Sequence, residues 1–328
     1  MKHRSDKRGT ALITALMITA VMSTVAVGLS QSLFFAIGRS GHIADRDQAY
    51  WYAVGARDFA ESALLRSLPP SGEPMRPTDA WAQGARRFEI ENGALTGEVR
   101  DANNCFNLNA LVTQAGRGGY TGDETAAEAF IALMQALNIP AGEAQAIAAQ
   151  ATDWIDTDTR PEARGAEDMQ YAQRPVPHRA ANTLFTEAGE MLALPAMNPA
   201  YFTLLAPLVC AHPVTEQIPL NPNTLRPDQA ALLAAALDNR LSLSDAALLI
   251  SRRPTTGYAD VEAVWQEPLL AGLELAPDAR PLFTLTSRYF EIHVDVLQGE
   301  TRYRLRESVE LDSTGRLTRH SQRFGVFS

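Results

Sequence analysis

Cysteine is nearly absent from this sequence, since two residues in 328 are too few for a small fold held by several disulfides or for a four-cysteine zinc site. Basic residues are also in the minority: 29 Lys and Arg stand against 38 Asp and Glu, and the formal net charge is −9. An acidic chain repels phosphate backbones, which disfavours general nucleic-acid binding. The catalytic signatures H-E-x-x-H, G-x-S-x-G and the P-loop do not occur either, so support for an enzyme is weak.

What the sequence does contain is a long run without charge. No Asp, Glu, Lys or Arg occurs from residue 10 to residue 38, which is enough for a helix of about 20 residues to cross a bilayer. The nine residues before it carry a net charge of +3, and the remainder of the chain carries −12. The positive-inside rule therefore predicts a single-pass inner-membrane protein with a cytoplasmic N-terminus and a periplasmic bulk.

The junction Lys7-Arg8-Gly9-Thr10 resembles the class III signal of type IV pilins and pseudopilins, in which a basic leader ending in Gly precedes a long apolar helix. In that family a prepilin peptidase cuts after the Gly and methylates the new N-terminus, which implies cleavage between Gly9 and Thr10. The chain departs from the family at Thr10, where Phe is usual, and at Thr14, where most members have Glu. An unpaired charge in lipid is costly, so a subunit without this acid should occupy a unique position, such as the end of a fibre. The alternative is an uncleaved signal anchor.

Beyond the membrane segment the helical pattern continues. Apolar residues recur at i, i+4, i+7, i+8 and i+11 in one stripe, which consists of Tyr52, Ala56, Phe59, Ala60 and Ala63. The stripe predicts that the membrane helix extends outward as an amphipathic helix that packs on something outside itself. This face is a candidate partner-binding surface.

Two regions alternate between apolar and polar residues, as strands do. The first, residues 88–99, contains the turn signal Glu91-Asn92-Gly93, and the second, residues 290–311, contains Gln298-Gly299-Glu300. The second region has one apolar and one charged face, the pattern of an antiparallel sheet packed on a helix.

Helical patterns occupy most of the chain between these two regions, with residues 217–221 predicted as a short strand that returns to the sheet. The predicted fold class is therefore α+β. A long N-terminal helix packs on an antiparallel sheet, as in pilins, and a large all-α insertion interrupts the sheet.

Five stretches spread along the chain resemble the minor pseudopilin K family of type II secretion systems: residues 49–53 (AYWYA), 105–111 (CFNLNAL), 153–158 (DWIDTD), 165–168 (GAED) and 221–224 (NPNT). In that family the insertion is described as two SAM-like units, and the subunit is placed at the pseudopilus tip. The resemblance implies that the partners are the other minor pseudopilins, the I and J components, with H as a further candidate.

With this resemblance the chain divides into seven parts. They are a leader (residues 1–9), a membrane segment (10–38), a periplasmic helix with the first strands (39–104), a first helical unit (105–215), a return strand (216–224), a second helical unit (225–281) and C-terminal strands (282–328).

The first helical unit contains a concentration of carboxylates, here named the acidic loop (residues 153–168). Its six acidic residues are Asp153, Asp156, Asp158, Glu162, Glu167 and Asp168. Converging carboxylates repel one another, and oxygen ligands alone favour Ca²⁺ over zinc or copper. The spacing is not that of an EF-hand, and a solvated loop with helix-capping Asp is the alternative. Members of the family that the chain resembles bind calcium in this region, and the resemblance therefore favours a structural calcium ion.

Cys105 and Cys210 bracket the first helical unit, and the predicted topology places both in the periplasm, where disulfides persist. Pairing would restrict the unfolded chain by roughly 4–5 kcal/mol in the loop-entropy model. The alternative is that both are separate buried thiols.

Together these features predict a non-enzymatic structural subunit, the tip-capping minor pseudopilin of a type II secretion machine. Two alternatives remain at this stage. The first is a minor pilin of a type IV pilus, used for adhesion or DNA uptake. The second is a membrane-anchored periplasmic metal-dependent hydrolase that uses the acidic loop.

Overall fold

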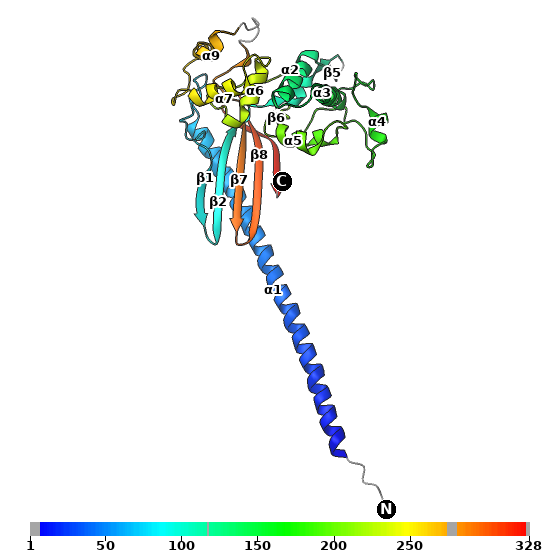
Figure 1. Cartoon of the computed structure of the whole chain (residues 1–328). Helices are drawn as coiled ribbons and strands as arrows, with labels where there is room; N and C mark the ends of the chain where they lie inside the picture. Colours follow the sequence, from blue (N-terminus) through cyan, green and yellow to red (C-terminus); the bar gives the residue numbers. More distant parts are fainter. Residues whose placement is uncertain (1–6, 117, 274–280, 326–328) are drawn as a thin grey trace, which may run out of the picture.

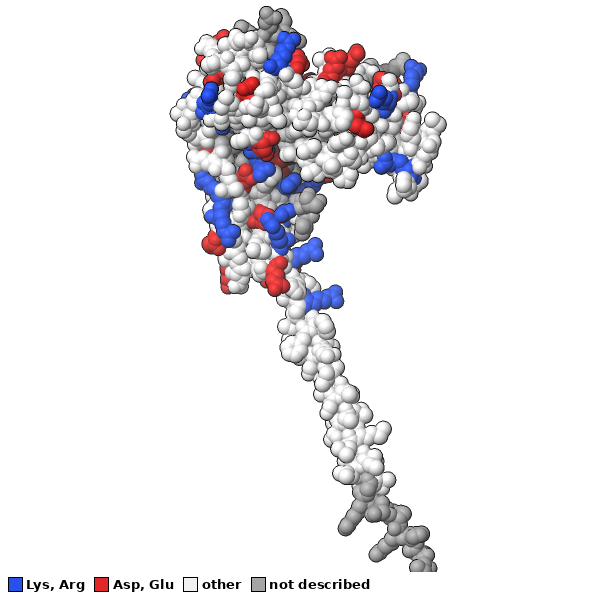
Figure 2. All heavy atoms as spheres, in the orientation of Figure 1, with Lys and Arg blue, Asp and Glu red and all other residues white. Residues whose placement is uncertain are grey.

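The computed structural model describes residues 7–116, 118–273 and 281–325. Its longest element is helix α1 (Lys7–Ser67), whose N-terminal half projects from the rest of the molecule as a stalk (Figure 1). Figure 2 shows most of this stalk free of charged side chains, and its most apolar 18-residue window has a mean hydropathy of 2.2 and no buried residue. The helix is therefore long and apolar enough to cross a membrane, as the sequence predicts.

Five antiparallel strands form a sheet against the C-terminal half of α1. Their spatial order is β1 (Arg86–Ile90), β2 (Gly93–Asp101), β7 (Tyr289–Gln298), β8 (Thr301–Leu311) and β9 (Leu317–Gly325). Both predicted hairpins are present, and they turn at Asn92 and Gly299, whose φ angles are 58° and 57°. The third strand of the C-terminal group, β9, lies within the predicted region of C-terminal strands (282–328), although no separate strand pattern was assigned to it. We call this sheet and the helix half that covers it the body.

Close contact between β2 and β7 depends on a glycine. A Cβ at Gly93 would lie 1.8 Å from the carbonyl oxygen of Leu297, so no larger residue fits there. These two strands are neighbours in the sheet although the whole insertion separates them in sequence. The insertion therefore leaves and re-enters the body at adjacent strand ends.

Small residues let α1 approach the sheet. Ala49 and Ala53 are fully buried in a cluster with side chains of β2, β7 and β8, and Tyr52, Ala56 and Ala60 pack against the same cluster. These three residues are half-buried against the chain's own sheet, so the sheet already covers part of the stripe for which a partner is expected. Periodicity shows that a helix has an apolar face, but it does not show which surface covers that face.

The residues between β2 and β7 form a second layer, which we call the head. Its helices are α2 (Glu124–Ala136), α3 (Ala141–Ile155), α4 (Asp168–Ala172), α5 (Pro199–Leu205), α6 (Ala230–Ala236), α7 (Leu243–Arg252), α8 (Val261–Trp265) and α9 (Pro268–Ala271). The hairpin of α2 and α3 packs on the hairpin of α6 and α7 through α2 and α6. One hydrophobic cluster runs through both hairpins, so the head has a common core. The expectation of an all-α insertion is wrong in one respect, because the head also contains two short two-stranded sheets: β3 (Phe106–Asn107) with β6 (Val209–Cys210), and β4 (Val112–Ala115) with β5 (Gly119–Gly122).

The predicted return strand, residues 217–221, does not join the body's sheet. Leu220 instead makes a single parallel bridge to Phe283. Pro219 and Pro222 flank the bridge on either side of Leu220, and proline has no N–H to extend a ladder. The expectation of a strand that returns to the sheet is therefore wrong.

Candidate functional site

Three carboxylates of the acidic loop converge between the end of α3 and the start of α4. One oxygen each of Asp156, Asp158 and Glu167 lies within 4.8 Å of the others. Asp156 and Glu167 are buried, whereas Asp158 is exposed. The Oδ1 atom of Asp156 and the Oε1 atom of Glu167 are buried without a hydrogen-bond partner. Buried polar atoms are nearly always satisfied, so two converging carboxylates that each retain an orphaned buried oxygen have the chemistry of a cation site.

The electrostatics of these residues agree with this geometry. Burial, followed by repulsion from Asp158 and Glu162, raises the pKa of Asp156 to about 6. Burial and the nearby charge of Asp156 raise the pKa of Glu167 to about 7. Both shifts mean that the ionised carboxylates destabilise one another in the protein alone. A hard divalent cation such as Ca²⁺ would compensate the charge with the oxygen ligands that it prefers.

The other three acidic residues predicted for the site lie elsewhere in the loop. Asp153 is fully buried and accepts a hydrogen bond from the backbone N–H of Glu162 at 3.1 Å, while burial raises its pKa to about 7. Gly165 allows the chain to pass over this carboxylate, because a Cβ there would lie 1.9 Å from Asp153 Oδ2. Asp168 accepts a hydrogen bond from the backbone N–H of Ala180 at 3.1 Å. The arrangement assigns Asp153 and Asp168 to loop structure and leaves Glu162 as an exposed neighbouring charge.

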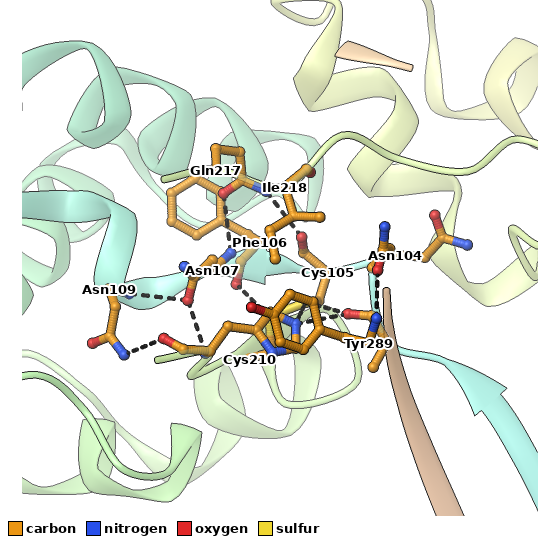
Figure 3. Close-up of a disulfide and its surroundings, with 12 residues drawn as sticks. Asn104, Cys105, Phe106, Asn107, Asn109, Cys210, Gln217, Ile218 and Tyr289 are labelled. Atoms are coloured by element: carbon orange, nitrogen blue, oxygen red, sulfur yellow. Dashed lines mark hydrogen bonds between the residues drawn. A yellow bond between two sulfur atoms is a disulfide. The ribbon is translucent and has the colours of Figure 1, made fainter. Parts of the chain in front are cut away.

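A disulfide joins Cys105 to Cys210 where the head begins (Figure 3). Beside it, β3 (Phe106–Asn107) pairs in parallel with β6 (Val209–Cys210). The bond therefore closes a large loop that contains α2 to α5, including the acidic loop. It links the entry of the first helical unit to its exit.

Two asparagines near the disulfide act as buried cross-links. Asn107 donates a hydrogen bond from its amide to the carbonyl of Val214 at 2.8 Å. Asn109 donates to the carbonyls of Phe185 and His212 at 3.0 and 2.8 Å. An amide side chain offers donors and an acceptor at once, so it can satisfy backbone groups that no sheet or helix satisfies. These residues belong to the sequence motif at 105–111, and the structure provides the reason for their type.

A second polar network ties the head to the end of β2, and we call it the neck network. Asp101 accepts hydrogen bonds from the hydroxyl of Thr224 at 2.5 Å and from that of Ser287. Asn221 donates from its side chain to Ser287 Oγ at 2.8 Å and from its backbone to Asn104 Oδ1 at 2.7 Å. The two passages of the chain between body and head, after β2 and before β7, are thus joined to residues 221–224 of the head within one buried network. The sequence signal at residues 221–224 was seen, but Asp101 and Ser287 were missed because isolated polar residues carry no periodic pattern.

The sequence of the chain is similar to those of known proteins over most of its length. Two family models described as "Type II secretion system (T2SS), protein K" match residues 104–214 and 220–286. The type II secretion system protein K of Pectobacterium carotovorum subsp. carotovorum is 33% identical over 94% of each chain, and that of Klebsiella pneumoniae is 33% identical with the same coverage. The chain belongs to the type II secretion system protein K family.

A solved structure supports the same conclusion at the level of the fold. A chain from the crystal structure of the GspK-GspI-GspJ complex of enterotoxigenic Escherichia coli aligns with a TM-score of 0.76 and 30% identity. The alignment covers 88% of this chain and all of the other. The α+β plan predicted from the sequence, with its long helix, antiparallel sheet and helical insertion, is therefore confirmed.

The predicted stripe lines a groove with all five of its residues, Tyr52, Ala56, Phe59, Ala60 and Ala63. This helix–hairpin groove lies between α1 and the β1–β2 hairpin, has a volume of about 450 Å³, and includes Trp51, Phe59, Ala63, Trp81 and Phe88 among its lining residues. The ring of Phe59 meets that of Phe88 edge to face at 6.4 Å, yet their residues are 59% and 44% exposed. Two exposed aromatic residues in one apolar groove are typical of a contact surface for another protein.

The expected processing junction lies within the first turns of α1. Residues 1–6 of the expected leader lie outside the described residues, and α1 runs without interruption from Lys7 through Gly9 and Thr10. The hydroxyl of Thr14 donates within the same helix, with the carbonyl oxygens of Thr10 and Ala11 each at 3.0 Å. The position at which most pilins have Glu therefore carries a hydroxyl satisfied by its own backbone.

Proposed function

We propose that this protein is a non-enzymatic minor pseudopilin that caps or initiates the pseudopilus tip of a type II secretion system. Its role is to help drive folded proteins across the outer membrane. The observation that carries the proposal is the position of the head. It lies beyond the end of the sheet, opposite the stalk, and is broader than the body beneath it (Figure 1). A subunit stacked above it would meet the head instead of another pilin-like body.

The N-terminal helix supports the same position. A subunit inside a fibre packs its N-terminal helix below other subunits, where their buried amino termini need a negative partner. Thr14 supplies no charge, and its hydroxyl bonds to its own helix. A terminal subunit has no such amine to neutralise. The basic leader that ends at Gly9 and the apolar run that follows it carry the rest of the proposal. Prepilin peptidase cleaves between Gly9 and Thr10, the stalk lies in the inner membrane, and the head lies in the periplasm.

The helix–hairpin groove is the proposed contact for partner subunits. The related GspK chain crystallised in a complex with GspI and GspJ, so partners of the I and J type are the expected occupants, with H as the next subunit. A partner anchored in the same membrane presents its own N-terminal helix parallel to α1. The groove begins near Trp51, above the membrane segment, and continues along α1 to Ser67. An apolar groove in this orientation suits a neighbouring pilin-type helix.

Exchange of Phe59 and Phe88 for Ser tests the groove. Both side chains are largely exposed, so the variant keeps the fold, while the loss of two aromatic anchors should reduce co-purification with the I and J components at least tenfold. Leu243→Ser is the matched control, because Leu243 is a similarly exposed apolar residue in the head. Unchanged recovery of the complex with the double variant would remove the groove from the proposal.

Calcium completes the proposed function as a structural ion. Asp156, Asp158 and Glu167 are the proposed ligands, and the ion would fix the segment between α3 and α4 on the head's surface. The pair of orphaned oxygens supports this assignment.

Immunogold labelling of pseudopili tests the tip position directly. Antibody against the head should label one end of each fibre and leave its length unlabelled. Regular labelling along the fibre would refute the capping role while leaving family membership intact. A type IV pilus subunit would instead be found on surface pili of cells that lack the secretion genes.

A further inference from the structure

One charged residue occupies a core-facing position of the body. Strand β8 directs Tyr303, Leu305 and Val309 toward α1, and Glu307 stands in the same phase of the strand. Its side chain is fully buried, with 0% exposure. A buried carboxyl group is costly unless it is neutral or fully paired. Nothing in the proposed tip role requires it.

Helix α1 and strand β9 supply the charged and polar groups around Glu307. They are Arg57, Asp58 and Glu61 of α1 and Arg319 and Gln322 of β9. Both arginines are engaged more closely by other acids. Arg319 forms two hydrogen bonds with Glu61, at 2.7 and 2.8 Å, but its Nε lies 3.6 Å from Glu307. Arg57 lies 2.7 Å from Asp58 and 3.9 Å from Glu307.

One of the two carboxylate oxygens of Glu307 has no hydrogen-bond partner. Gln322 donates to Oε2 at 2.9 Å, whereas the buried Oε1 accepts no hydrogen bond. Across β7 the paired residue is Ile292, which is apolar. Full ionisation would place the three carboxylates of Asp58, Glu61 and Glu307 against two guanidinium groups, and among these carboxylates Glu307 is the one with no exposure to water. A proton on Glu307 removes the excess charge and supplies a donor toward Glu61.

The titration behaviour of the pair agrees with this geometry. Burial, together with a hydrogen bond to Glu61, raises the pKa of Glu307 to about 7. The hydrogen bonds from Arg319 lower the pKa of Glu61 below its ordinary value. One member of the pair is thus held ionised and the other protonated.

We propose that Glu61 and Glu307 hold one proton between them and form a latch that fastens α1 to the β8–β9 hairpin below neutral pH and loosens above it. The latch lies on the side of α1 that faces the C-terminal strands, whereas the helix–hairpin groove lies beside the β1–β2 hairpin. Loss of the proton leaves a second negative charge beside Glu61 and weakens the contact of β9 with the helix. The body of this subunit is therefore tightest in mildly acidic surroundings.

Hydrogen exchange of the β8 and β9 amides tests the latch in the full chain in detergent with saturating calcium, which keeps the acidic loop from titrating. Glu307→Gln retains a donor toward Glu61 but cannot ionise. At pH 5 the variant and the parent should show equal protection. At pH 8 the variant should be protected on the order of 100-fold more strongly, because each unit of pKa shift corresponds to a tenfold change in the equilibrium.

The control is Glu89→Gln, an exposed carboxylate on β1 that should change protection at neither pH. Equal protection of the parent and Glu307→Gln at pH 8, or the same difference at both pH values, would overturn the latch. If Glu307→Gln fails to fold, infrared spectra of the Glu167→Gln protein labelled with ¹³C-glutamate decide the question, because Glu167 also has a raised pKa and would add a band in the same pH range. A protonated glutamate band at pH 6 that disappears by pH 8 supports the latch, and its absence at pH 6 refutes it.

Discussion

The acidic loop yields the sharpest prediction, because one substitution should have opposite effects with and without calcium. The perturbation is Glu167→Gln, which keeps the size and an acceptor but removes a buried charge. Without a cation, the ionised form of Glu167 is unfavourable in the folded state, because burial raises its pKa from the ordinary value of 4.5 to about 7. A shift of this size corresponds to about 3 kcal/mol at most, and partial solvation reduces it to about 2 kcal/mol.

The pH dependence follows from the sign of the shift. Between pH 4.5 and 7 the folded chain holds the proton on Glu167 more tightly than the unfolded chain, so the metal-free protein loses stability as the pH rises. Asp156 adds to the loss between about pH 4 and pH 6, because its pKa is also raised. Above pH 7 both contributions are fully lost, and the slope from these groups ends.

The assay is thermal unfolding of the full chain in detergent at pH 8, with either chelator or calcium. In chelator, Glu167→Gln should raise the melting temperature by roughly 4 °C, taking the head as the cooperative unit. Calcium at 100 times its dissociation constant should stabilise the parent by about 2.7 kcal/mol, while the variant should respond weakly. Glu143→Gln, an exposed acid on α3, is the control and should change neither value. The reasoning is refuted if Glu167→Gln lowers the melting temperature equally in chelator and in calcium, since the carboxylate would then be structural.

Three further outcomes are expected. Gly9→Ala should leave the leader attached, so the intact mass from membranes would begin at Met1; a mature chain of normal length would contradict class III processing. Replacement of both Cys105 and Cys210 by Ser should lower the free energy of unfolding by about 4 kcal/mol, measured by denaturant titration, because the disulfide closes a loop of about 100 residues. Asp101→Asn should cost about 1–3 kcal/mol in the same titration, because the hydroxyls of Thr224 and Ser287 lose the carboxylate oxygen that accepts from both. A change below 0.5 kcal/mol would remove Asp101 from the neck network's support.

Local patterns were sufficient for the long helix and for two hairpins. The spacing of apolar residues within a short stretch of sequence predicts a helix or a strand, and turn signals such as Asn92-Gly93 involve only a few positions. Strand β9 has no recognisable local pattern because Arg319 and Gln322, which pair with Val309 and Glu307 of β8, stand where a strand pattern would need apolar residues. Its identity depends on pairing with β8, a neighbour that the local pattern does not reveal.

The composition of the sequence revealed the acidic loop, but it did not reveal which carboxylates converge and which bond to the backbone. Six carboxylates in sixteen positions indicated a cation site, and the fold then brought three of them together. Asp153 was turned instead toward the backbone at Glu162, and Asp168 toward Ala180. Which oxygen faces a cation depends on the path of the loop around Gly165, and this path is set by packing.

The sequence by itself determined the long apolar helix, the strand hairpins, the helix-rich insertion and the family, because each of these depends on residue order over short spans or on motifs. Only the tertiary structure decided what covers each surface. It packed Tyr52, Ala56 and Ala60 partly on the chain's own sheet and formed a groove along the same stripe, in which Phe59 and Phe88 are exposed. It also buried Glu307 beside Glu61, whose partnership is invisible in the sequence. Such contacts join residues far apart in the chain, and their energies exist only once the helix and sheet have packed.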